Sequence, residues 1–119
     1  MIEKKIQSFK YAWKGILIAW REELNFKIQV VIAAFVFFLS FAFKISDSEL
    51  LFVIISIGAV LAIETLNTAL EEFCDMVQSS HDPHVAKIKD LGAGASLIMS
   101  IAAFMTGVVI FLPYIAKLI

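Results

Sequence analysis

The stretch from residue 91 to residue 116 contains no charged side chain, and this run constrains the fold more than any other feature of the sequence. It is long enough to cross the ~30 Å hydrocarbon core of a membrane as a helix. The chain of 119 residues is also 61% hydrophobic, more than a soluble domain of this size can bury. We therefore expect one membrane-embedded, all-α domain over residues 1–119, with spans at about 28–43, 50–75 and 91–116.

The N-terminal segment, residues 3–21, has a different pattern from the spans. Its apolar residues recur at helical spacing, while Lys10, Lys14 and Arg21 lie largely off that stripe. Such a segment is typical of an amphipathic helix that lies in the membrane interface. The apolar stripe consists of Ile6, Phe9, Trp13, Ile16, Leu17 and Trp20.

The distribution of lysine and arginine predicts the orientation in the membrane. Most of these residues precede the first span or lie near Lys87 and Lys89, and only Lys44 and Lys117 remain for the opposite side. The positive-inside rule then places the N-terminus and residues 76–90 in the cytoplasm and the C-terminus on the far side.

The net charge of −1 gives no case for a nucleic-acid partner. Cys74 is the single cysteine, so no intrachain disulfide is possible.

Two local signals mark where helices begin. Ser46 is followed three residues later by Glu49, which is the spacing of a capping box, so we expect Glu49 to cap the second span rather than to act in catalysis. Asp82 followed by Pro83 is typical of an N-cap with proline at the first helical position. The small residues 92–96 favour close helix packing at the cytoplasmic end of the last span.

Residues 64–75, ETLNTALEEFCD, carry polar side chains where an apolar run should be ending. At about 100° per residue, Glu64, Asn67, Glu71 and Asp75 fall on one helix face. Glu64 lies roughly 22 Å along the helix from Glu49, which places it inside or at the edge of the hydrocarbon core. Ionisable residues at such depth usually mark a functional site. The alternative is that they join helices through hydrogen bonds.

Further charged residues are expected at the same level. Glu23 and Lys27 precede the first span, and Lys87, Lys89 and Asp90 precede the third. Carboxylates and lysines together suit Mg²⁺ bound to a polyphosphate. A nucleotide cannot enter hydrocarbon and a lipid cannot leave it, so phosphorylation of a membrane lipid alcohol fits this boundary. A deeper carboxylate would serve as general base.

Three segments carry a resemblance to a known family. The segments YAWKGILIAWREELNFK, ETLNTALEEFCD and KDLGAGAS occur in order at matching separations, and the resemblance extends over almost the whole chain. The sequence resembles the prokaryotic diacylglycerol kinases, small integral-membrane lipid kinases that include undecaprenol kinases. This resemblance implies a surface helix with three transmembrane helices, a homotrimer with composite sites between subunits, and ATP with Mg²⁺.

The resemblance also implies roles for individual residues. Glu64 matches the catalytic base that activates the lipid hydroxyl, and Asn67 matches the motif asparagine that supports it. Glu23 and Glu71 match the metal-binding carboxylates. Lys89 matches the lysine that contacts the ATP phosphates.

The nucleotide site extends further and departs from the family pattern in places. Nucleotide contacts are also predicted at Lys4, Tyr11, Asp75 and Asp90. Many members have histidine where Asp82 stands, and His81 and His84 flank that position without filling it. Neither histidine has the neighbours of a metal site, so a solvated loop is expected for both. Lys27 stands where arginine is common, which keeps the charge but loses the bidentate fork.

These patterns predict an enzyme of the bacterial cytoplasmic membrane that transfers the γ-phosphoryl group of ATP to a lipid hydroxyl. Diacylglycerol, giving phosphatidic acid, is the expected substrate, and the YAWKG stretch favours that branch. Undecaprenol on the same scaffold is the alternative. A non-enzymatic helical subunit, such as a proton relay through Glu64, is the alternative of another class, and the lysines disfavour it.

Overall fold

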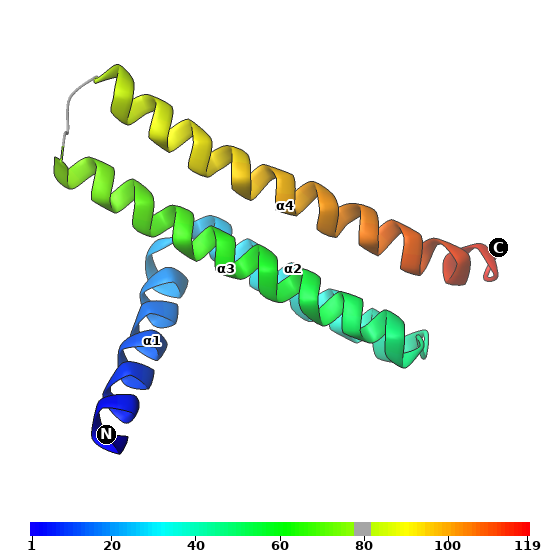
Figure 1. Cartoon of the computed structure of the whole chain (residues 1–119). Coiled ribbons are helices and arrows are strands. Elements are labelled where there is room, and N and C mark those ends of the chain that lie inside the picture. The colour runs from blue at the N-terminus through cyan, green and yellow to red at the C-terminus, as the bar shows by residue number, and fades with distance from the viewer. Residues whose placement is uncertain (78–81) are drawn as a thin grey trace.

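The computed structural model describes residues 1–77 and 82–119, and these parts form four helices without strands (Figure 1). The last three helices are each long and apolar enough to cross a membrane, which confirms the predicted number of spans. The polar stripe continues the second span as one unbroken helix. The helices are α1 (Ile2–Glu22), α2 (Leu24–Ala42), α3 (Asp47–Val77) and α4 (Pro83–Ala116).

Helix α3 is the centre of the arrangement. It packs along α4 and also contacts α2, whereas the backbones of α2 and α4 stay further apart among the described residues. Successive helices α2, α3 and α4 run antiparallel, and α1 leaves their axis at a steep angle (Figure 1). Only 11% of each apolar window is buried within the chain. The apolar surface of a single chain therefore faces lipid or other subunits.

The end of the bundle that carries the α2–α3 turn is closed by local and long-range contacts. Ser46 Oγ accepts from the Glu49 N–H at 3.2 Å, and Glu49 Oε1 accepts from the Ser46 N–H at 3.0 Å. This confirms the capping box. The hydroxyl of Tyr114 donates to the same Glu49 oxygen at 2.5 Å, and Phe43 packs its ring 5.9 Å from that of Tyr114. Lys44 adopts a positive φ of 52°, which ends α2 and lets the chain turn back.

The opposite end brings α3 and α4 close together. Asp82 accepts from the His84 N–H at 2.8 Å with Pro83 at the start of α4, which confirms the predicted N-cap. A Cβ built on Gly92 would overlap Asn67 Oδ1 of α3. The expected use of small residues for packing therefore holds at Gly92, where the two backbones approach closely.

Candidate active site

Glu64 is the buried charged residue at the centre of the site. Its side chain is only 6% exposed, on the face of α3 that packs against α4. The hydroxyl of Ser96 on α4 donates a hydrogen bond of 2.7 Å to Glu64 Oε2. A buried carboxylate is costly without a donor, and Ser96 supplies one.

Glu23 lies at the break between α1 and α2, close to the polar stripe of α3. Its backbone is extended, with φ −110° and ψ 110°, and its N–H still bonds to the Ala19 carbonyl at 3.0 Å. Partial burial, followed by the negative charges of Glu71 and Glu64, raises the pKa of the Glu23 carboxyl above its usual value. The fold therefore brings carboxylates from the α1–α2 junction and from α3 into one electrostatic cluster.

Asn67 lies one turn of α3 beyond Glu64. Its Oδ1 is buried and has no hydrogen-bond partner among the described residues. The missing side chain of Gly92 leaves the space that this oxygen occupies. Buried polar atoms in native proteins are nearly always paired, so this amide oxygen, packed between α3 and α4 against Gly92, is an exception one helical turn from the buried carboxylate.

Lys89 and Asp75 form an ion pair that connects the N-terminal part of α4 to the C-terminal end of α3. The Lys89 Nζ and Asp75 Oδ1 atoms are 2.5 Å apart, and the two side chains are 38% and 61% exposed. An ammonium group that is paired but partly open to solvent remains accessible to the phosphates of a nucleotide. Asp75 holds it at the same end of the bundle as Glu71.

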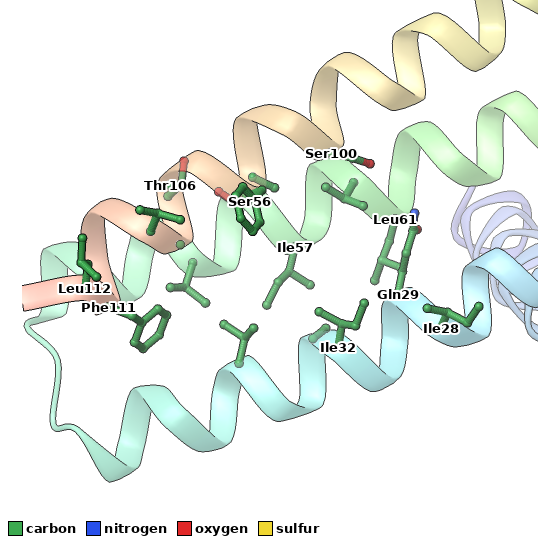
Figure 2. A pocket seen from close by; sticks show the side chains of 18 of the residues that line it. Ile28, Gln29, Ile32, Ser56, Ile57, Leu61, Ser100, Thr106, Phe111 and Leu112 are labelled. Carbon is green, nitrogen blue, oxygen red and sulfur yellow. The ribbon is translucent and has the colours of Figure 1, made fainter. Parts of the chain in front are cut away.

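An apolar groove of about 670 Å³ lies between α2, α3 and α4 (Figure 2). Apolar side chains of all three helices, including Ile32, Ile57 and Phe111, point into it. Its lining reaches Leu61 on α3 and Ser100 on α4, each one helical turn from Glu64 and Ser96, respectively. The buried carboxylate therefore lies one helical turn beyond the lining of the groove.

Comparison of the sequence with known proteins identifies the family of this chain. The family model described as "Prokaryotic diacylglycerol kinase" matches residues 10–111. The chain belongs to this family. The undecaprenol kinase of Bacillus subtilis (strain 168) is 31% identical over 112 residues, which are 94% of this chain and 91% of that protein. The diacylglycerol kinase of Escherichia coli (strain K12) is 29% identical over 101 residues, covering 85% of this chain and 83% of that protein.

A second diacylglycerol kinase extends the comparison to another lineage. The protein of Synechocystis sp. (strain ATCC 27184 / PCC 6803 / Kazusa) is 32% identical over 112 residues, which cover 93% of this chain and 64% of that protein. The relatives thus carry two different substrate names on one family scaffold. They support a membrane-embedded lipid kinase over a non-enzymatic subunit.

The predicted site residues of this kinase fall into two groups in the single chain. Glu23, Glu64, Asn67 and Glu71 gather around the α1–α2 junction and the middle of α3, with Lys89 and Asp75 paired beyond them. The other predicted residues lie outside that cluster. Asp90 is exposed on α4, and Lys4 and Tyr11 are exposed on α1, whose N-terminal part leads away from the bundle (Figure 1). The expectation of a solvated loop is wrong for His84, which is exposed but lies in the first turn of α4 because Asp82 and Pro83 start the helix before it. His81 lies outside the described residues.

The carboxylates present fit a divalent cation of the kind that a kinase uses. Within residues 1–77 and 82–119, no three potential ligands form a complete protein coordination shell. Mg²⁺ does not require one, because it usually takes one or two carboxylates and completes its octahedron with water and phosphate oxygens. Glu23 and Glu71 offer such oxygens near the α1–α2 junction, and their mutual repulsion favours the binding of a cation there.

Ser96 is the residue near the site that the sequence did not predict. It stands in the small-residue run and could be taken for packing alone. A signal for it does exist, because Ser96 follows Lys89 by seven residues and so shares its helix face.

Proposed function

We propose that this lipid kinase uses ATP and Mg²⁺ to phosphorylate the hydroxyl of a membrane lipid, with Glu64 as the general base. The main support for the proposal is a buried carboxylate that lies one helical turn beyond the lining of an apolar groove. The groove suits the hydrocarbon chains of a lipid, and the cluster of Glu23, Glu71 and Lys89 suits the phosphates of a nucleotide. The two substrates would meet at Glu64.

The chemistry follows from these positions. The Glu64 carboxylate takes the proton of the lipid hydroxyl as the lipid oxygen forms its bond to the γ-phosphorus. The bond from that phosphorus to the β–γ bridging oxygen breaks, and ADP leaves. Glu23 and Glu71 would hold Mg²⁺, which neutralises charge on the phosphates when bound. The Lys89 ammonium would add positive charge on the same side, and Asn67 would support the site from the neighbouring turn of α3.

Diacylglycerol, converted to phosphatidic acid, is the substrate we place first. Undecaprenol is the second candidate, and the Bacillus subtilis relative named undecaprenol kinase supports it with a match over 94% of this chain. Both are lipid alcohols whose chains would lie in the same groove. Gln29 stands in that groove with a buried amide oxygen that has no partner in the described part of the chain, so it is a candidate contact for a polar part of the lipid.

We further propose that the active unit is a homotrimer in the bacterial cytoplasmic membrane, with composite sites between subunits. The large exposed apolar surface and the distance of Lys4 and Tyr11 from the carboxylate cluster support this assembly. In a trimer, α1 or the N-terminal residues of one subunit would complete the nucleotide site of the next. The N-terminus and the α3–α4 connection would face the cytoplasm, where ATP is available.

The role of Glu64 is tested by replacing it with glutamine, which keeps size and hydrogen bonding but cannot take the proton. Glu64→Gln should lose at least 99% of the rate of lipid phosphorylation, by analogy with the 10²–10⁴-fold contribution of general bases. Glu72→Gln is the matched control, since Glu72 is an exposed neighbour on α3 to which no role is given. Normal turnover by Glu64→Gln would remove the proposed base.

A further inference from the structure

Ser96 makes the hydrogen bond that connects α4 to the buried carboxylate. Its Oγ lies 2.7 Å from Glu64 Oε2, across 32 positions of sequence. The other hydroxyl bonds on the same stretch of α3 are local, because Thr65 and Thr68 donate to backbone carbonyls one turn earlier in their own helix. The hydroxyl of Ser96 therefore reaches a side chain on a neighbouring helix, where it meets the one buried carboxylate of the described residues.

The close approach of the helices at Gly92 explains how so short a side chain reaches Glu64. Helices α3 and α4 run antiparallel, so one turn toward the C-terminus of α4 matches one turn toward the N-terminus of α3. Ser96 lies one turn beyond Gly92 on α4. Glu64 lies one turn before Asn67 on α3. Asn67 Oδ1 fills the space beside Gly92, and Ser96 meets Glu64 at the next level. A larger residue at position 92 would separate the helices and stretch the Ser96–Glu64 bond.

We propose that Ser96 is a positioning residue for the phosphoryl transfer, which fixes the Glu64 carboxylate so that Oε1 faces the lipid hydroxyl. The inference rests on the proposed function, since it requires Glu64 to be the base. With Oε2 held by the Ser96 hydroxyl, rotation of the carboxylate is restricted and one oxygen remains free. Ser96 touches neither substrate in this account, and it acts only through Glu64.

The physical reason is that proton transfer needs a narrow geometry. The base and the hydroxyl must come within hydrogen-bond reach while the lipid oxygen is aligned with the phosphorus. A carboxylate at the edge of hydrocarbon that lacks its donor turns toward water or toward any other donor, because an unpaired buried charge is costly. The loss of Ser96 would therefore reduce the fraction of bound complexes in which Glu64 is correctly directed. Binding of ATP would be unaffected.

A purely structural role for the same bond predicts a different outcome. If the bond only joins helices, its loss lowers the unfolding midpoint, and the enzyme that remains folded keeps its full kcat. If Ser96 positions Glu64, kcat falls in folded enzyme while KM for ATP stays constant. Measurement of kcat and of KM for ATP therefore distinguishes the positioning role from the purely structural role.

The experiment compares Ser96→Ala, Ser96→Thr and Ser40→Ala in detergent–lipid micelles. Ser40 is the matched control, because its hydroxyl is also buried but bonds to the Val36 carbonyl within α2, away from the site. We measure kcat, KM for ATP and lipid, and the thermal midpoint. Ser96→Ala should lose about 10- to 100-fold in kcat, the scale of a misplaced reacting group. Its KM for ATP should stay near wild type, Ser96→Thr should recover most of kcat, and Ser40→Ala should match wild type.

Each contrary result has its own meaning. A wild-type kcat in folded Ser96→Ala overturns the inference and leaves the lipid kinase activity in place. If Ser96→Ala does not fold, Ser96→Cys replaces it as a near-isosteric residue with a weak donor, and wild-type kcat there overturns the inference equally. If the wild-type enzyme phosphorylates neither diacylglycerol nor undecaprenol, the proposed function fails and the role of Ser96 falls with it.

Discussion

Replacing Gly92 by alanine perturbs the packing of α4 against Asn67 and Leu70 of α3, next to the site. The added Cβ would overlap Asn67 Oδ1 and lie 2.9 Å from Leu70 Cδ2. Such overpacking costs about 1–3 kcal/mol. Alanine regains about 1 kcal/mol of helix propensity over glycine, so the net loss of stability is about 0–2 kcal/mol. The strain is relieved either by separation of the helices or by rotation of Asn67, and both displace groups around Glu64.

The effect on activity should therefore exceed the effect on stability. We expect kcat for lipid phosphorylation to fall at least tenfold in Gly92→Ala, since either relaxation displaces site groups by a fraction of an ångström or more. The control is Gly94→Ala, because a Cβ at Gly94 meets nothing within 4 Å. The assay pairs initial rates with unfolding curves in one detergent. Equal kcat and equal stability for Gly92→Ala and Gly94→Ala would refute the reasoning.

Three further predictions concern the two ends of the bundle. Tyr114→Phe removes the donor to Glu49, so the thermal midpoint should fall while kcat stays at wild type; a loss of kcat at unchanged midpoint would contradict this. Asp75→Asn should raise KM for ATP with little change in midpoint, because an exposed ion pair adds little stability but directs Lys89; an unchanged KM would remove Asp75 from the nucleotide site. The pKa of Glu23 is raised in the folded protein, so the folded state binds this proton more tightly than the unfolded state does. The resulting contribution to stability is complete below the unfolded-state pKa and is lost as pH rises through the folded-state pKa. Without Mg²⁺, the midpoint of the wild-type protein should therefore decline more steeply with rising pH than that of Glu23→Gln, and parallel curves would argue against the carboxylate cluster.

Local sequence signals predicted the helix boundaries that depend on neighbouring residues. The Ser46–Glu49 capping box and the Asp82–Pro83 helix start both form as expected, because each bond joins residues at most three positions apart. The polar stripe on α3 was also predictable, since helical periodicity alone places Glu64 and Asn67 on one face. The depth of Glu64 in the membrane, counted in residues along the helix, stays a prediction.

Contacts between distant residues were beyond the sequence. Ser96 bonds to Glu64 over 32 positions and Tyr114 bonds to Glu49 over 65. The spacing from Lys89 places Ser96 on the face of the site but does not name Glu64 as its partner, and no spacing in the sequence pairs Tyr114 with Glu49. Glu49 was correctly predicted as a cap, but its second role in holding the end of α4 was not predicted. The groove depends on how α2 and α4 pack on either side of α3, which is a property of the whole bundle rather than of any one segment.

The proposed activity of the protein is the transfer of phosphate from ATP to a lipid. The most direct measurement adds ATP labelled at the γ-phosphate to the purified protein with Mg²⁺, in micelles that contain diacylglycerol, undecaprenol or neither. We expect a labelled phospholipid with at least one of the two lipids and no labelled product without lipid. Removal of Mg²⁺ should abolish the product. Folded, oligomeric protein that labels neither lipid would contradict the proposed activity.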